Sequence, residues 1–131
     1  MLVIDDDAGV RRLLHTVLTV KHLEVVEAES AADAQRRLAD FRPDAIIIDL
    51  TLAETRGLEL LRQLRRRTDL NGVPMILITG NPSDADRSRA LEAGADEVIA
   101  KPFGVVDLQT RVLRLLKEGR PRLRRSARLA G

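Results

Sequence analysis

Short apolar runs alternate with amphipathic stretches along the chain. Residues 2–4 and 45–48 are uninterrupted apolar runs rich in β-branched side chains, which is typical of parallel strands covered on both faces. Residues 10–18 instead repeat apolar positions at i, i+3, i+4, i+7 and i+8, the spacing of one helical face. The same reasoning over the whole chain predicts strands at residues 2–4, 24–28, 45–48, 75–78 and 97–100.

A helix is predicted after each strand. Ser30 has N-cap character, with Asp33 in the first turn of a helix that runs to about residue 40. The third helix is expected after a loop that closes at Gly57, and Gly94 is expected to stop the fourth. The predicted helices cover residues 10–18, 31–40, 58–67, 83–93 and 108–116.

Five strands, each followed by a helix, predict an α/β fold. We expect a doubly wound, five-stranded parallel sheet of order 2-1-3-4-5 with helices on both faces, since a barrel needs about eight such units. The length and the 44% hydrophobic content fit one domain at residues 1–118. Residues 119–131 are expected to be a basic tail or the start of a linker, and an effector domain beyond residue 131 stays open.

Cysteine content and charge narrow the function classes. The chain has no cysteine, which favours a reducing compartment and a cytoplasmic location, and no apolar run is long enough to cross a membrane. The net charge of +2 includes five arginines between residues 120 and 128, so residues 1–118 carry −3. With only Phe41 and Phe103 as aromatic residues, direct nucleic-acid binding by residues 1–118 is not expected. The arginine-rich segment is interpreted as a linker or solvated tail, with binding to nucleic acid or anionic lipid as the alternative.

Polar residues follow four of the five predicted strands. Asp5 and Asp6 come after the first, Asp49 after the third, Thr79 after the fourth and Lys101 after the fifth. The carboxyl ends of parallel strands share one edge of the sheet, where ligands bind in open α/β folds. We therefore expect these side chains to form one site.

A divalent cation is expected at this site. Two carboxylates about 4 Å apart repel by roughly 4 kcal/mol at an effective dielectric of about 20. A ligand set made only of oxygens favours Mg²⁺, with Mn²⁺ as a workable substitute. Asp49 is then suited to attack phosphorus in line, while Lys101 pairs with one phosphoryl oxygen and Thr79 donates to another.

Four sequence motifs resemble the signature regions of response-regulator receiver domains. They are Leu2-Val3-Ile4-Asp5-Asp6-Asp7, Ile46-Ile47-Ile48-Asp49-Leu50, Ile78-Thr79-Gly80 and Lys101-Pro102-Phe103. One such motif alone is weak, but four in order make a chance match improbable. Residues 91–96 resemble the family as well, and the resemblance covers about residues 1–118.

The resemblance implies a role for each site residue. Asp49 is the phosphoacceptor, Asp6 a direct metal ligand and Asp5 a ligand that acts partly through water. The backbone carbonyl of Thr51 is implied as a further metal ligand, and the Lys101-Pro102 bond is implied to be cis. Thr79 and Lys101 become the switch hydroxyl and the phosphate-pairing lysine. The implied donor is a phosphohistidine on a sensor histidine kinase or a phosphotransfer protein.

The chain departs from the family pattern at two places. Val98 stands three residues before Lys101, where receivers often have Tyr or Phe, so rotation of a buried aromatic ring cannot report phosphorylation here. Residues 53–57 replace the Pro-x-x-Asp-Gly loop that often follows the acceptor. Output coupling is therefore expected to differ from the usual pattern.

Charged residues on the fourth helix, fifth strand and fifth helix mark an expected signalling surface. In transcription-factor receivers a similar face dimerises through salt bridges, and an ordinary charged surface is the alternative. The surface comprises Arg87, Arg89, Glu97, Val98 and Arg111, and Asp96 and Arg114 are expected on the same face. His15 and His22 are interpreted as exposed residues, and residues 65–67 as a solvated, basic helix end.

The sequence thus predicts a switch that is phosphorylated on Asp49 and changes the surface of the fourth helix, fifth strand and fifth helix. The alternative is a receiver-like docking module that works without phosphorylation. A phosphatase of the haloacid-dehalogenase type is disfavoured because Thr51 stands where such enzymes carry a general acid, and its nucleophile would lie on the first strand. A flavodoxin-like cofactor carrier is disfavoured because acids follow the first strand. We therefore expect no enzyme activity beyond the chain's own phosphorylation and dephosphorylation.

Overall fold

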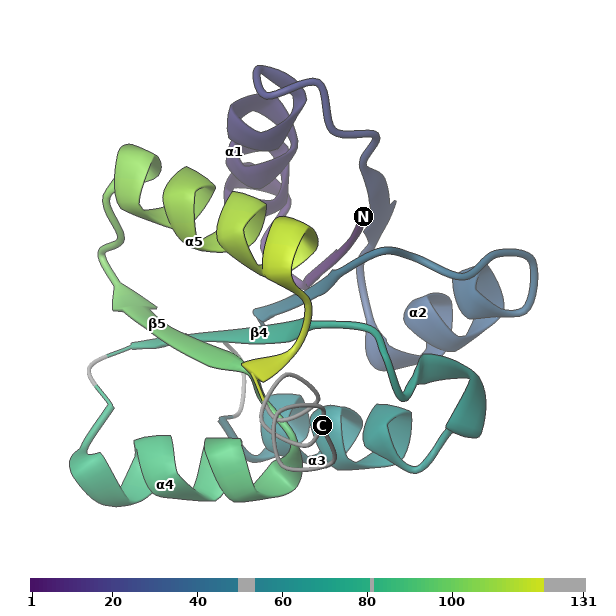
Figure 1. Cartoon of the computed structure of the whole chain (residues 1–131), viewed down its shortest axis with the longest axis vertical. Coiled ribbons are helices and arrows are strands. Elements are labelled where there is room, and N and C mark those ends of the chain that lie inside the picture. Colours follow the sequence, from purple (N-terminus) through teal and green to yellow (C-terminus); the bar gives the residue numbers. More distant parts are fainter. Residues whose placement is uncertain (50–53, 81, 122–131) are drawn as a thin grey trace.

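The computed structural model describes residues 1–49, 54–80 and 82–121 and contains a five-stranded parallel sheet (Figure 1). The strand order is β2-β1-β3-β4-β5, which confirms the predicted topology. The edge strand β2 has only three residues, where the sequence predicts five. The other edge strand, β5, has five residues. The strands are β1 (Leu2–Asp5), β2 (Val26–Ala28), β3 (Ile46–Asp49), β4 (Met75–Gly80) and β5 (Glu97–Lys101).

Helices cover both faces of the sheet, with α1 and α5 on one side and α3 and α4 on the other (Figure 1). None of the helices within the described ranges is both long and apolar enough to cross a membrane. The helices are α1 (Ala8–Thr19), α2 (Ala31–Leu38), α3 (Glu54–Arg65), the 3-10 turn η1 (Thr68–Leu70), α4 (Asp84–Ala93) and α5 (Val105–Glu118).

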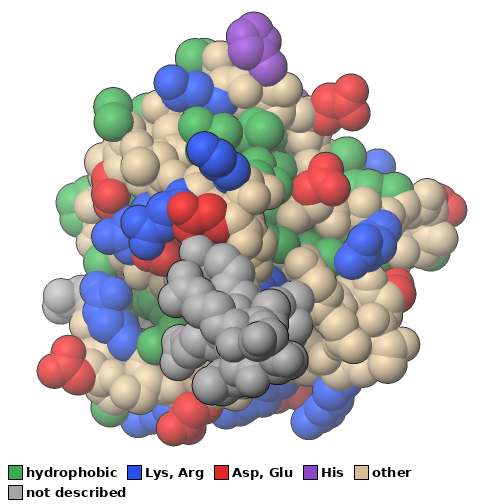
Figure 2. Space-filling view, viewed as in Figure 1, with side chains coloured by type: hydrophobic (Ala, Val, Ile, Leu, Met, Phe, Trp, Pro, Cys, Tyr) green, Lys and Arg blue, Asp and Glu red, His purple; other side chains and the backbone are tan. Residues whose placement is uncertain are grey.

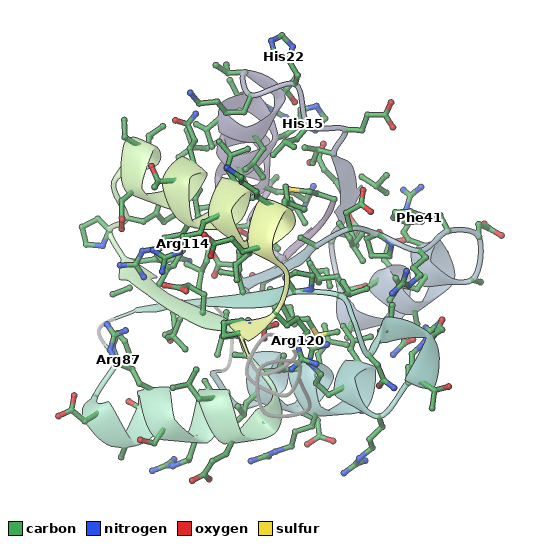
Figure 3. The ribbon with its side chains drawn as sticks, in the orientation of Figure 1. His15, His22, Phe41, Arg87, Arg114 and Arg120 are labelled. Atoms are coloured by element: carbon green, nitrogen blue, oxygen red, sulfur yellow. The ribbon has the colours of Figure 1, made fainter. Side chains whose placement is uncertain are left out.

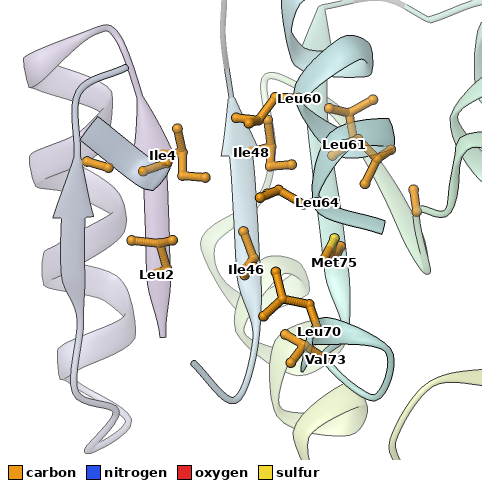
Figure 4. Close-up of a cluster of buried hydrophobic side chains, with 14 of the residues drawn as sticks. Leu2, Ile4, Ile46, Ile48, Leu60, Leu61, Leu64, Leu70, Val73 and Met75 are labelled. Carbon is orange, nitrogen blue, oxygen red and sulfur yellow. The ribbon is translucent and has the colours of Figure 1, made fainter. Parts of the chain in front are cut away.

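Alternate side chains of the central strands point into two separate hydrophobic cores, one on each face of the sheet. Ile46 and Ile48 point to the core shared with α2, α3 and α4, which Figure 4 shows against Leu60, Leu61 and Leu64. Ile47 points to the opposite core, which α1 and α5 complete. Because β1 and β3 are buried on both faces, their ends are held in fixed positions at the edge of the sheet.

Local signals place several helix ends where the sequence predicts them. The Ser30 hydroxyl accepts a hydrogen bond from the Asp33 amide at the start of α2. Ser83 and Asp86 form a reciprocal capping box at the start of α4, and Gly94 ends that helix with φ 117°.

Two predictions about α3 are wrong. The helix begins at Glu54, so Gly57 lies inside it and does not close a loop, and Gly57 is buried there. Burial of the apolar face of the helix outweighs the cost of about 1 kcal/mol that a helical glycine carries. Arg65 is not part of a solvated helix end, since its side chain is only 11% exposed and is ion-paired with Asp96.

Candidate functional site

Four predicted site residues lie at the same edge of the sheet, because they occupy the carboxyl ends of adjacent parallel strands. Asp5 on β1 is the register partner of Asp49 on β3. On the other side of β3, Gly80 of β4 is paired with Lys101 of β5, and Thr79 directly precedes Gly80. Residues separated by up to 96 positions in the sequence are thereby gathered at one place.

A buried ion pair joins two of them. The Lys101 Nζ lies 2.7 Å from Asp49 Oδ1, so the lysine side chain reaches from β5 past β4 to the end of β3. The Asp49 side chain is 1% exposed and the Lys101 side chain 23% exposed. A carboxylate this far from water requires such a partner to stay ionised.

Burial is the main influence on the protonation of both paired acids. Burial, together with the nearby charge of Asp49, raises the pKa of Asp5 to about 7. Burial also raises the pKa of Asp49, and the Lys101 ammonium opposes that rise. One lysine therefore faces two buried carboxyl groups, which leaves room for one further positive charge, either a proton or a metal ion.

The residues present fit a hard divalent cation. Asp5 Oδ1 accepts a hydrogen bond from the Asp7 amide at 2.8 Å, while the buried Asp5 Oδ2 has no hydrogen-bond partner in the described part of the chain. The half-buried Asp6 is close enough for its charge to raise the pKa of Asp49. A free, buried carboxylate oxygen beside a second carboxylate is a natural ligand pair for Mg²⁺.

Protein side chains do not supply a complete ligand set here. Across residues 1–49, 54–80 and 82–121, no three acidic or histidine side chains gather closely enough to hold a metal ion by themselves. Mg²⁺ typically keeps several water ligands in proteins, so one or two carboxylates are sufficient. The Thr51 carbonyl, the remaining ligand implied by the family resemblance, lies outside the described residues.

Three further predictions concern Thr79, the Lys101-Pro102 bond and the loop at residues 53–57. Thr79 is half buried near the end of β4, one residue from the register partner of Lys101. The Lys101-Pro102 peptide bond is cis. Of the altered loop at residues 53–57, Ala53 lies outside the described residues and the others belong to α3.

One residue that sequence reasoning missed contacts the site directly. Arg11 donates from a terminal guanidinium nitrogen to the Asp5 carbonyl at 2.8 Å, and its Nε donates to Glu27 Oε1 at 3.1 Å. His15 Nδ1 lies 3.1 Å from the other Glu27 carboxylate oxygen, so His15 is not merely an exposed side chain. The signal for Arg11 was its place on the first turns of the helix that follows the acidic strand end, together with an acid on the neighbouring strand.

The expected signalling surface is only partly exposed. Arg111 is paired with Glu97 at 2.7 Å and with Asp107 at 3.1 Å, while Arg89 is exposed. Figure 2 shows basic and acidic side chains next to one another on this face, near the position of Arg114 in Figure 3. Arg87, also labelled in Figure 3, donates to the Val98 carbonyl at 3.3 Å.

Two residues assigned to that surface are buried. The prediction for Val98 is wrong, because it is 7% exposed and packs in the core with α3 and α4. The expectation for Asp96 is also wrong, because its side chain is 2% exposed and ion-paired with Arg65 and Arg120. Side chains alternate along β5, so Val98 and Ile99 point into the two opposite cores of the sheet. The buried charge of Asp96 is compensated by its two arginine partners.

Comparison with known families decides the identity of this fold. The family model of the response regulator receiver domain matches residues 1–113. The chain belongs to this family. It is therefore a receiver domain of the two-component signalling type.

Receiver-containing transcriptional regulators are similar in sequence. The KDP operon transcriptional regulatory protein KdpE of Escherichia coli is 37% identical over 112 residues, which cover 86% of this chain and 48% of that protein. The phosphate regulon transcriptional regulatory protein PhoB of Pseudomonas aeruginosa is 33% identical, with 92% of this chain and 53% of PhoB covered. The chain thus spans about half the length of these relatives.

Solved receiver structures share the fold. The signal receiver domain of a histidine kinase from Syntrophus aciditrophicus has a TM-score of 0.80 at 34% identity, covering 89% of both chains. The receiver domain of NtrX from Brucella abortus has a TM-score of 0.80 at 27% identity, covering 88% of this chain and 97% of that one. Both of these neighbours are themselves receiver domains, and the first belongs to a signal transduction histidine kinase.

Proposed function

We propose that this receiver domain accepts a phosphoryl group on Asp49 from a phosphohistidine, carried by a sensor histidine kinase or a phosphotransfer protein, in a Mg²⁺-dependent reaction. The buried Asp49–Lys101 ion pair beside Asp5, at the carboxyl edge of the sheet, is the observation that carries the proposal. A structural carboxylate has no need of a second buried acid at its register partner, whereas a phosphoryl acceptor does, because the pair binds the metal.

Asp49 supplies the nucleophile. One of its carboxylate oxygens attacks phosphorus in line, and a P–O bond forms as the P–N bond to the donor imidazole breaks and its electron pair returns to that ring. Lys101 favours the ionised form of Asp49 before the reaction, because its ammonium opposes the effect of burial on the Asp49 pKa. Asp5, Asp6, Asp49 and the Thr51 carbonyl would hold Mg²⁺. When bound, the ion would neutralise charge on the phosphoryl oxygens, and Mn²⁺ would serve similarly.

Thr79 and Lys101 would respond to the new group. After transfer, Lys101 pairs with one phosphoryl oxygen and the Thr79 hydroxyl donates to another. Thr79 is the last residue but one of the strand that leads to α4, and Lys101 ends the strand that leads to α5. Movement of these side chains would therefore shift the α4–β5–α5 surface between two populations. Arg87, Arg89, Glu97 and Arg111 lie on these elements, where a change could be read by a partner or by a second copy of the chain.

The relatives suggest the output. Because KdpE and PhoB are transcriptional regulators of about twice this length, we propose that an effector domain follows residue 131 and that this cytoplasmic receiver controls it. Residues 1–118, with their net negative charge, would not bind nucleic acid themselves.

Intact mass after incubation with acetyl phosphate tests the proposal. The wild type should gain about 80 Da only when Mg²⁺ is present, and Asp49→Asn should gain nothing. Asp69→Asn is the matched control, because this exposed acid pairs with Arg67 away from the carboxyl ends of the strands. This variant should be labelled like the wild type. A wild type that forms no adduct, and whose Asp49 region is also unperturbed by beryllofluoride in NMR spectra, would leave the docking module as the function.

A further inference from the structure

Asp96 is buried between two arginines at the edge of the sheet opposite Asp49. It directly precedes β5, and its amide donates to the carbonyl of Met75, the first residue of β4. Its Oδ2 accepts from Arg65 at 2.7 Å and from the Met75 amide at 2.9 Å. Its Oδ1 accepts from Arg120 Nε at 2.9 Å, and the same Nε lies 3.2 Å from Oδ2.

Arg65 already satisfies the charge of Asp96 from within the domain. Besides Asp96, Arg65 donates to the Gly94 carbonyl at 2.8 Å and to the Leu70 carbonyl at 3.0 Å. It thereby ties the end of α3 to the start of β5. One carboxylate needs only one guanidinium for neutrality, so the second arginine requires a different explanation.

Arg120 lies beyond the end of α5 and yet is buried. Its side chain is 10% exposed, and a terminal nitrogen donates to the Asn71 carbonyl at 2.7 Å while Nε engages Asp96. Two guanidinium nitrogens thus meet two different acceptors, a geometry that lysine cannot reproduce. The site is therefore specific for arginine.

The chain turns at Gly119 to bring Arg120 into this site. Gly119 follows α5 with φ 76°, a conformation that favours glycine, and its amide closes the helix by donating to Leu115. The chain then descends from α5 toward α3, where Figure 3 labels Arg120. The sequence predicts a tail from residue 119, whereas the side chain of Arg120 is buried against the folded domain.

We propose that Asp96 and the Asn71 carbonyl form a docking site for Arg120, which fixes the direction in which the chain leaves the receiver domain. Whatever follows residue 121 would start from the edge formed by the α3–β4 and α4–β5 connections, not from the axis of α5. This inference does not rest on phosphorylation of Asp49, because the docking site lies at the opposite ends of the strands.

Backbone ¹⁵N relaxation of the full chain tests the proposal, with Arg120→Gln compared with Arg114→Gln. Arg114 lies on α5 with its side chain 66% exposed and 4.0 Å from Glu118, so its substitution removes the same charge without touching the docking site. We expect order parameters at positions 119 and 120 of about 0.85 in the wild type and Arg114→Gln, and below about 0.6 in Arg120→Gln. Arg120→Lys should resemble Arg120→Gln.

Unchanged order at positions 119 and 120 in Arg120→Gln, with an otherwise native amide spectrum, would overturn the docking site. High mobility of these positions in the wild type would do the same. Asp96→Asn gives a second test from the other side of the contact. It should loosen position 120 while the Arg65 Nε–H signal persists, because that group donates to the Gly94 carbonyl and not to Asp96.

Discussion

Asp5 and Asp49 are direct register partners on neighbouring parallel strands, and both are almost completely buried. Lys101 compensates one of the two carboxyl groups, since its ammonium lies 2.7 Å from Asp49. Without a metal ion, ionising Asp5 as well places two negative charges beside one positive charge away from water. The folded state is thus destabilised when both acids are ionised and no metal ion is bound. Binding of a metal ion or a phosphoryl group changes this charge imbalance.

The metal-free protein should lose stability as pH rises toward and through 7, in part because of Asp5. Its pKa is about 7 in the folded state and near 3.8 when unfolded, so the folded state binds the proton more tightly between these values. The stabilisation is complete below about pH 4 and is lost as pH rises through about 7. At about 1.4 kcal/mol per pKa unit, Asp5→Asn should raise the free energy of unfolding by about 2 to 4 kcal/mol at pH 8, and by less at pH 5.

Urea unfolding in the presence of a chelator measures this difference at both pH values. Asp40→Asn, which changes an exposed acid in the turn after α2, should match the wild type at each pH. A stability gain in Asp5→Asn that is equal at pH 5 and pH 8 would mean that Asp5 is not titrating in this range.

Adding Mg²⁺ should reverse the instability. A ligand present at ten times its dissociation constant stabilises the folded state by about 1.4 kcal/mol, which for a domain of this size raises Tm by several degrees. Asp5→Asn and Asp49→Asn should each lose most of that increase, because each removes a buried carboxylate. Thermal unfolding with MgCl₂, compared with NaCl of equal ionic strength, measures this rise in Tm. An equal rise in the wild type, Asp5→Asn and Asp49→Asn would place the metal elsewhere.

Lys101→Met should slow the labelling of Asp49 by acetyl phosphate. The substitution removes the ammonium that opposes the burial-driven rise in the Asp49 pKa, so a smaller fraction of the acceptor is ionised. It also removes a charge-assisted contact to the phosphoryl group, of about 1.5 to 3 kcal/mol, which corresponds to roughly 10- to 100-fold in rate. The initial rate of the mass increase measures the effect, with exposed Lys117→Met as the control. A rate for Lys101→Met within twofold of the wild type would count against its role.

The strand and helix order could be predicted because it depends on local periodicity. Continuous apolar runs such as residues 45–48 have few alternatives to a buried parallel strand. The site at the strand ends then followed from topology alone, since carboxyl ends of parallel strands share an edge. Asp5, Asp49 and Lys101 could therefore be brought together before any coordinates were known.

Charge pairing across the fold could not be predicted in the same way. Arg65 and Asp96 are 31 residues apart, and nothing local shows that they meet. A basic run at a helix end is usually solvated, and Arg66 is indeed exposed, whereas Arg65 faces inward because helical geometry turns it toward the α4–β5 connection. The start of α3 was missed because a glycine that usually marks a boundary is accommodated inside a packed helix.

Gly94→Ala should be among the most destabilising small substitutions in the domain. Gly94 has φ 117°, which side chains rarely adopt, and an added Cβ would lie 2.2 Å from Arg65 Cγ and 2.9 Å from Arg65 Cδ. Arg65 cannot simply move away, because its guanidinium is held by the Gly94 and Leu70 carbonyls and by Asp96. Backbone strain and loss of these contacts together should lower the free energy of unfolding by about 3 kcal/mol or more.

Gly80→Ala is the matched control for Gly94→Ala. An added Cβ at Gly80 meets no atom of the described residues within 4 Å, so the free energy of unfolding of Gly80→Ala should stay within about 1 kcal/mol of the wild type. Urea unfolding of both variants under one condition decides the comparison. If Gly94→Ala were as stable as Gly80→Ala, Arg65 would have to be free to move away from Gly94, against the hydrogen bonds that hold its guanidinium. The same pair of variants therefore tests whether Arg65 is held rigidly against the end of α4.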